Sequence, residues 1–147
     1  GAPVKPGQIL VKIERDGYGQ GVLDQGEGWN WQGISAAGRP LNPLYPNTRS
    51  ELWFSTARMA DEGQLDLSRL SKQVLARLRQ QALAPTYRLD GAGRKVVEPK
   101  DQTKKRIGRS PDDLDGLNQA FYATGNSDAS AEWIHQNETT RKPVFTR

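Results

Sequence analysis

Cysteine is absent from this sequence of 147 residues. Its absence excludes disulfides, zinc sites built on thiolates and a cysteine nucleophile. A chain without disulfides fits a reducing compartment, and we expect a cytoplasmic protein. The sequence also lacks a signal-peptide segment and any apolar run near the roughly 18 residues of a membrane span, so we expect no membrane partner. Histidine is nearly absent too, since His135 is the single histidine of the sequence. It lies in a polar stretch that offers neither a zinc site nor a catalytic triad.

Hydrophobic residues are also scarce, at 35% of the chain, whereas 15 glycines and 9 prolines indicate much loop. The length is that of one domain. The net charge is +4, and the basic residues gather at positions 100–109. This bias permits nucleic-acid binding without proving it. A nucleotide-binding phosphate loop is missing, since the glycines and lysine of residues 90–95 have the wrong spacing for one.

The pattern of apolar residues and turn formers predicts a mixed α/β domain over residues 1–125, followed by a polar C-terminal tail over residues 126–147. A capping box at Thr48-Arg49-Ser50-Glu51 predicts a helix to about Ala60. The other expected elements are strands at 9–14 and 29–34, a helix whose apolar positions Leu67, Leu70, Val74 and Leu78 lead to about Gln81, a hairpin over 87–98, and a helix from Ser110.

The helix from Ser110 carries three carboxylates in its first turn. Ser110 suits the N-cap and Pro111 the first helical position, with Asp113 completing the capped end. Leu114, Leu117 and Phe121 are the expected buried stripe of this helix. Helical spacing places Asp112 and Asp115 on one side, from which both project together into a cleft. The alternative is that these acids only complement the helix dipole.

A further acid, Asp16, follows the first predicted strand and precedes a glycine-rich turn that allows close backbone approach. Ligands of α/β sheets bind beyond the carboxyl ends of strands. An acid there, paired with an acid on a later helix, is suited to bridging divalent metals for phosphodiester hydrolysis. The alternative is a turn aspartate that caps its own backbone.

Three segments in order resemble the C-terminal nuclease domain of phage large terminase subunits, the DNA-packaging motors. Residues 104–117, KKRIGRSPDDLDGL, resemble the family's basic stretch followed by Ser-Pro-Asp-x-x-Asp-Ala-Leu. Residues 13–24, IERDGYGQGVLD, resemble its second acidic strand with a Gly-x-Gly turn, and residues 45–53, YPNTRSELW, its Asn-x-Arg-x-Glu-x-Trp helix start. The match covers about residues 9–123.

The resemblance implies an RNase H-like mixed sheet flanked by helices, with two-metal cleavage of double-stranded DNA by Mg²⁺ or Mn²⁺ during genome packaging. Asp16, Asp112 and Asp115 would be the catalytic, metal-binding acids. The implied partners are DNA, the rest of the large subunit, and the portal or small terminase subunit, in the cytoplasm of a bacterial host. The residues expected to contact DNA phosphates are Lys100, Lys104, Lys105, Arg106 and Arg109.

Two departures qualify this resemblance. The family's first catalytic Asp lies on an earlier strand, so we expect the domain to be incomplete at its N-terminus, and we do not take Glu14 as the replacement. Gly116 also stands where the family usually has Ala, which costs about 1 kcal/mol of helix propensity. Two other functions therefore stay open: a DNA-contacting or motor-docking module with an incomplete nuclease centre, and a purely structural protein.

Overall fold

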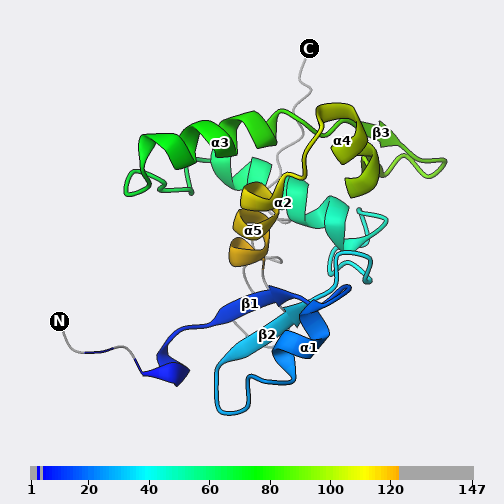
Figure 1. Ribbon diagram of the computed structural model, residues 1–147. Coiled ribbons are helices and arrows are strands. Elements are labelled where there is room, and N and C mark those ends of the chain that lie inside the picture. Colours follow the sequence, from blue (N-terminus) through cyan, green and yellow to red (C-terminus); the bar gives the residue numbers. More distant parts are fainter. Residues whose placement is uncertain (1–2, 4, 123–147) are drawn as a thin grey trace.

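A computed structural model describes residues 3 and 5–122 of the chain (Figure 1). A short 3₁₀ turn at Pro6–Gln8 precedes two strands and a small helix, and four longer helices with a hairpin form the rest. The prediction of a mixed α/β domain is confirmed. The predicted tail 126–147, including His135, lies outside the described residues. Within them, every helix is too short or too polar to span a membrane.

The first part of the fold is a parallel pair of strands joined by a short helix. Strand β1 (Val11–Glu14) pairs with β2 (Trp31–Ile34), and Glu14 lies opposite Ile34. Helix α1 (Gly19–Leu23) makes the crossover and packs on both strands. The predicted close approach is confirmed at Gly19, where an added Cβ would lie 1.6 Å from the carbonyl oxygen of Glu14. A glycine is therefore required at this position.

Helix α2 (Thr48–Asp61) begins where the sequence predicted, but the expected capping box is wrong by one residue. Asn47 is the N-cap, and its Oδ1 accepts a hydrogen bond of 2.9 Å from the backbone N–H of Ser50. Glu51 instead accepts bonds of 2.8 Å from the N–H groups of Leu41 and Asn42 and from the Tyr122 hydroxyl. Its buried carboxylate thus joins the preceding loop to the end of the described chain.

The next elements confirm the hairpin and correct one boundary. Helix α3 (Lys72–Ala82) begins after the N-cap Ser71, so the predicted helical positions Leu67 and Leu70 precede it. Strands β3 (Tyr87–Leu89) and β4 (Lys95–Val97) are antiparallel, as predicted. The basic run, which the sequence did not predict as helical, forms helix α4 (Lys100–Ile107).

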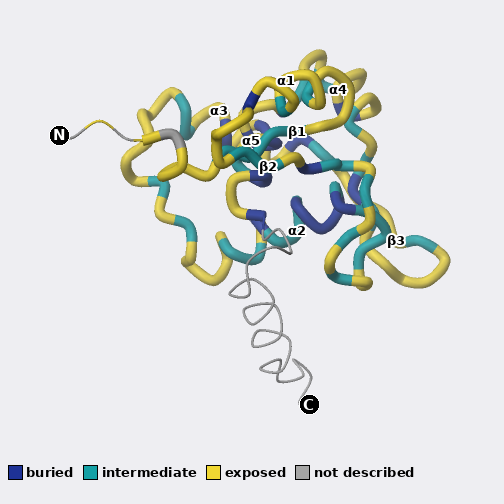
Figure 2. The backbone as a smooth tube through the Cα atoms, turned by 90° about the horizontal axis from the view of Figure 1, so that it is seen from below, coloured by how far each residue is buried: buried dark blue, intermediate teal, exposed yellow. Residues whose placement is uncertain are grey.

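Helix α5 (Asp112–Phe121) packs against β1, α2 and α3, at the centre of Figure 1. The predicted buried stripe is correct for Leu114 but wrong for Phe121, which is 42% exposed. The buried face is largely polar, because it also carries Asp115, Asn118 and Gln119. Figure 2 shows that buried residues concentrate where α2 and α5 meet, whereas strand β3 is exposed.

The end of α5 is fixed to the first strand by a lysine. The Lys12 ammonium on β1 donates hydrogen bonds to the carbonyl oxygens of Ala120, at 3.1 Å, and Tyr122. Tyr122 also belongs to a core cluster with Ile34 of β2 and Leu52 of α2. These contacts join the first strands of the fold to the end of the last described helix.

Candidate functional site

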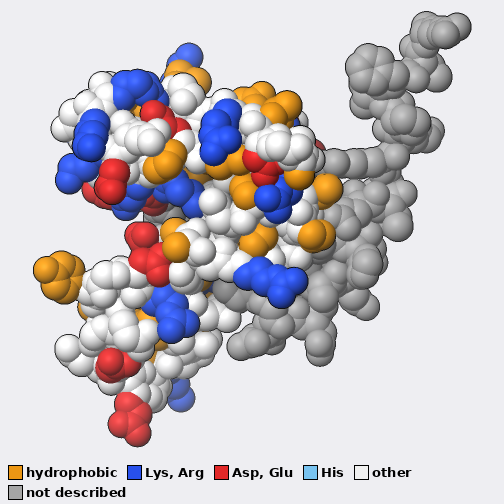
Figure 3. Space-filling model, turned by 90° about the vertical axis from the view of Figure 1, so that its right-hand side faces the viewer, with side chains coloured by type: hydrophobic (Ala, Val, Ile, Leu, Met, Phe, Trp, Pro, Cys, Tyr) orange, Lys and Arg blue, Asp and Glu red, His pale blue; other side chains and the backbone are white. Residues whose placement is uncertain are grey.

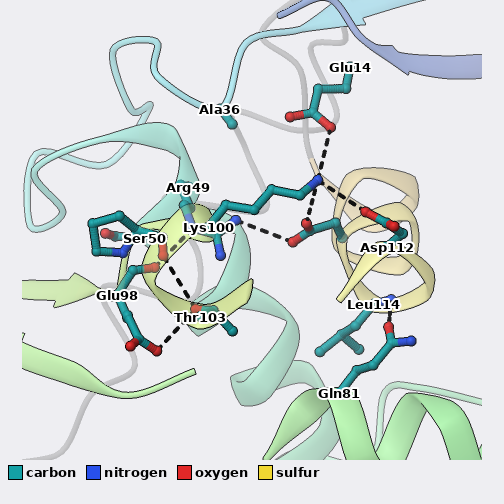
Figure 4. Close-up of polar contacts among 12 residues, drawn as sticks. Glu14, Ala36, Arg49, Ser50, Gln81, Glu98, Lys100, Thr103, Asp112 and Leu114 are labelled. Carbon is teal, nitrogen blue, oxygen red and sulfur yellow. Dashed lines mark hydrogen bonds and ion pairs between the residues drawn. The ribbon is translucent and has the colours of Figure 1, made fainter. Parts of the chain in front are cut away.

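Three carboxylates, one from β1 and two from the first turn of α5, converge on one lysine ammonium (Figure 4). The Nζ atom of Lys100 lies 3.1 Å from Oδ2 of Asp115, 3.2 Å from Oδ1 of Asp112 and 3.8 Å from Oε2 of Glu14. We call Glu14, Asp112 and Asp115 the acidic cluster. Three like charges repel one another unless a cation balances them, and here the ammonium supplies that charge.

Each member of the acidic cluster is placed by the end of an element. Glu14 is the last residue of β1, whose pairing with β2 fixes its direction. Asp112 and Asp115 lie in the first turn of α5 and face the same ammonium, so the prediction that they share a side of the helix is confirmed. Lys100 is the first residue of α4, which follows the hairpin after Glu98 and Pro99.

A second cation holds Asp115 from the other side. The Arg49 guanidinium lies 3.3 Å from Oδ1 of Asp115, and both side chains are nearly buried, at 13% and 11% exposed. Arg49 also donates to the carbonyl oxygen of Glu98 and stacks over the Trp53 ring. Asp115 is therefore held in a fixed orientation, with Oδ1 on Arg49 and Oδ2 on Lys100.

The charges of this site follow from its surroundings. The Ser110 hydroxyl and the Lys100 ammonium lower the pKa of Asp112, whose side chain is 75% exposed. Burial lowers the pKa of Lys100, but its bonds and charge interactions with the acidic cluster outweigh burial and raise it overall. Lys100 is thus positively charged at neutral pH, and Asp112 is negatively charged.

Asp113 turns away from the acidic cluster and joins α5 to α3. Its carboxylate lies 3.2 Å from Nε of Arg77 and accepts a bond of 2.7 Å from Nε2 of Gln81. The expected cap by Ser110 is wrong, because Pro111 occupies the N-cap position and forms no side-chain cap. Oε1 of Gln81 instead accepts a hydrogen bond of 2.9 Å from the N–H of Leu114. A side chain of α3 thus satisfies a backbone donor in the first turn of α5.

Asp16 lies in the turn after β1 and contacts the segment after β2. Its carboxylate accepts bonds of 2.7 Å from Ser35 Oγ and from the N–H of Ala36, and one of 3.3 Å from the N–H of Ala37. Among the described contacts, none joins Asp16 to the acidic cluster. Glu14, which sequence reasoning set aside, belongs to the acidic cluster instead, and its place at the carboxyl end of the first strand was the signal that could have identified it.

The predicted DNA-contacting residues divide into engaged and exposed groups. Lys100 is held by the acidic cluster, and Arg106 forms an ion pair of 2.7 Å with Glu98. Lys104 and Lys105 are exposed on α4, and Arg109 beyond it donates to Gln80. Figure 3 shows Lys and Arg side chains over the part of the molecule that carries the longer helices and hairpin, above a notch bordered by acidic side chains.

The acidic cluster has the chemistry of a hard-cation site, because carboxylate oxygens are the ligands that Mg²⁺ and Mn²⁺ prefer. Within residues 3 and 5–122, no three acidic or histidine side chains stand in an arrangement that holds a metal ion directly. The ammonium of Lys100 lies where the carboxylates converge. The donor chemistry thus suits a divalent metal, but binding would need the carboxylates to move closer together as well as the lysine to leave.

No protein-family model and no curated protein matches the sequence. Solved structures do match the fold. The nuclease domain of the large terminase subunit gp2 of bacterial virus Sf6 aligns with a TM-score of 0.64 and 15% identity over 79% of this chain and 66% of that chain. The chain has the fold of a phage terminase nuclease domain. The RNase H-like class inferred from the three sequence motifs is thereby confirmed.

Two further structures of the terminase nuclease domain contain metal. A point mutant of the Sf6 domain with manganese aligns with a TM-score of 0.63 at 16% identity, over 78% of this chain and 66% of that one. The same mutant with manganese and beta-thujaplicinol gives 0.62 and 14%, over 79% and 66%. Our chain therefore spans slightly less than two thirds of the Sf6 domain.

Proposed function

We propose that this chain is the nuclease domain of a phage or prophage terminase large subunit and cleaves double-stranded DNA in a divalent-metal-dependent reaction during genome packaging. One observation carries the proposal: Glu14, Asp112 and Asp115 converge on a single cation within a fold shared with terminase nuclease domains. Two structures of the Sf6 domain with manganese support a divalent cofactor, either Mg²⁺ or Mn²⁺.

In this proposal Asp112 and Asp115 bind metal, with Glu14 as the acid contributed by the strand. Asp16 remains a predicted ligand, and it would have to release its bonds to Ser35, Ala36 and Ala37. A bound divalent metal would activate the attacking water and stabilise the leaving oxygen. Arg49 orients Asp115.

Exposed basic residues at and just beyond α4 supply the DNA contacts of the proposed nuclease. Lys104 and Lys105 on α4, with Arg109, lie just before the helix that carries Asp112 and Asp115. Contacts to phosphates position DNA without reading its sequence, so we expect weak sequence preference. The proposed partners are the rest of the large subunit and the portal or small terminase subunit, and the proposed location is the cytoplasm of the bacterial host.

The decisive test is plasmid nicking with Mg²⁺ or Mn²⁺. The Asp112→Asn variant should lose cleavage, by at least about a hundredfold, because the amide cannot replace a charged metal ligand. Asp113→Asn is the matched control, because Asp113 lies on the same turn but faces Arg77 and Gln81. A thermal melt should first show that this variant is folded, and the folded variant should retain cleavage. Equal cleavage by wild type and Asp112→Asn would contradict the assigned role.

The second candidate is a DNA-contacting or motor-docking module without nuclease activity. The position of Lys100 within the acidic cluster favours it, because an ammonium already balances these carboxylates. This alternative predicts no cleavage at any metal concentration together with salt-sensitive DNA binding. Loss of both activities would point to a structural protein.

A further inference from the structure

We propose that a cavity between α2, α3 and α5 is a binding site for a small, largely apolar molecule that carries an amide edge, an N–H donor beside a carbonyl acceptor. The residues of the acidic cluster do not line this cavity. The inference therefore goes beyond the proposed nuclease function and does not depend on it.

The cavity exists because two helices that share a neighbour are held apart. Helices α2 and α3 both pack against α5 (Figure 1), but among the described elements they scarcely contact each other. Ala57 and Ala60 of α2 lie in the walls, and their small side chains leave the space between the helices unfilled. The loop between α2 and α3 adds Leu65 and Leu67 to the walls. The cavity has a volume of about 320 Å³, which is in the range of small-molecule sites.

The walls of the cavity are mostly apolar, as in other sites for small molecules. The residues that matter most to the argument are Trp53, Ala57, Leu67, Leu78, Leu117 and Asn118. Contact with the apolar walls removes apolar ligand surface from water, which favours binding but selects little among ligands of similar shape. The polar groups of the walls therefore decide which molecule binds.

One polar side chain of the walls has no hydrogen-bond partner. Asn118 on α5 is 2% exposed, and within the described part of the chain neither its Nδ2 nor its Oδ1 forms a hydrogen bond. Buried polar groups are nearly always paired, because an unpaired one loses its bonds to water without replacement. The indole N–H of Trp53, another residue of the walls, is also unpaired there.

The chemistry of Asn118 specifies the polar part of the ligand. A carboxamide offers a donor and an acceptor side by side, so its complement is the donor–acceptor edge of another amide. The χ2 angle of asparagine is only softly restrained, and a small rotation turns one edge of Asn118 toward the cavity. An amide ligand would then satisfy both atoms. A ketone of the same shape would leave the Oδ1 acceptor unpaired, which gives the site its selectivity.

The stability of the ligand-free protein is the first test. Asn118→Leu replaces an unpaired polar side chain with an apolar one of similar size beside an apolar cavity. We expect the melting temperature to rise by about 2 °C or more, because the cost of burying an unpaired amide is removed. An unchanged or lower melting temperature would mean that Asn118 is paired within the fold, and it would overturn the inference.

The second test uses naphthalene-2-carboxamide and its ketone analogue 2-acetylnaphthalene, with affinities for the full chain measured by ligand-observed NMR titration. Wild type should bind the amide at least about tenfold more tightly, because the ketone lacks the N–H donor. Asn118→Leu should lose this preference. Ala57→Phe should bind neither probe, since its ring occupies the cavity. Ala92→Phe, which adds the same ring in the exposed turn of the hairpin, is the control and should bind as wild type does.

Every other outcome would count against the inference. Equal affinity of wild type for the two probes would overturn the role of Asn118, and failure to bind either probe would overturn the site. Binding retained by a folded Ala57→Phe variant would place the probe elsewhere on the protein and would overturn the site too. None of these results bears on DNA cleavage, so the proposed nuclease function is tested separately.

Discussion

Three aspartates within four positions of one helix have three different surroundings. Asp112 is open to solvent, Asp113 bonds to α3, and Asp115 is nearly buried between Arg49 and Lys100. A difference of one residue on a helix rotates a side chain by about 100°, which is enough to send neighbouring carboxylates to different elements. The role of each of these three aspartates therefore depends on its own contacts and cannot be inferred from the number of acids in the segment.

Glu98, the residue after β4, gives a pH-dependent prediction at this scale. Its hydrogen bond with Arg106 is the main cause that lowers the pKa of Glu98 from 4.5 to about 2. Between these values the unfolded state binds more protons than the folded state, so stability rises with pH. The contribution is fully present above about pH 4.5 and is lost as the pH falls through about 2.

Denaturant unfolding of the wild type between pH 5 and pH 2 should therefore show that the protein takes up as much as about one proton when it unfolds. The Glu98→Gln variant should lack this uptake. Glu62→Gln, at the exposed C-cap of α2, is the control and should leave the profile unchanged. An identical pH profile for wild type and Glu98→Gln would show that the ion pair with Arg106 does not contribute.

Among the elements, α1 depends on one glycine. An added Cβ at Gly19 would lie 1.6 Å from the Glu14 carbonyl oxygen, whereas one at Gly21 in the same helix meets nothing within 4 Å. Gly19→Ala should lower the free energy of unfolding by about 1–3 kcal/mol or more, because backbone must shift. Gly21→Ala should raise it by about 0.5–1 kcal/mol. Urea denaturation of the two variants measures both, and equal effects would contradict the close approach.

The elements also show how far the sequence could predict this fold. The hairpin and the starts of β1, α2 and α5 were found to within about two residues, because turn glycines and local apolar patterns specify them. The cap of α5 was not predictable, since Gln81 supplies it from another helix. Glu14 was set aside for a similar reason: strand register, not composition, decides that it faces α5 while Asp16 contacts the loop after β2.

Over the whole molecule, some basic side chains are held in ion pairs and others are exposed to solvent. Lys100 and Arg106 are engaged by carboxylates, whereas Lys104 and Lys105 are exposed on α4. If α4 faces DNA, replacing both exposed lysines with alanine should reduce the slope of log affinity against log salt by about 2, because two phosphate contacts are lost.

Fluorescence anisotropy with duplex DNA at several salt concentrations measures this slope. The double variant Lys5→Ala and Lys72→Ala, which removes the same charge outside α4, is the control and should keep the wild-type slope. Equal slopes for the α4 variant and wild type would place the DNA elsewhere.

The lysine of β1 that holds the end of α5 has a consequence for the order of folding. Its partners Ala120 and Tyr122 lie 108 and 110 positions further along the chain. Closing so long a loop carries an entropic cost before any contact forms, and such non-local pairings slow folding. During synthesis, β1 leaves the ribosome long before α5 exists. The carboxylates of Glu14, Asp112 and Asp115 can therefore meet only after α5 has been made, and the proposed metal site cannot assemble early in the nascent chain.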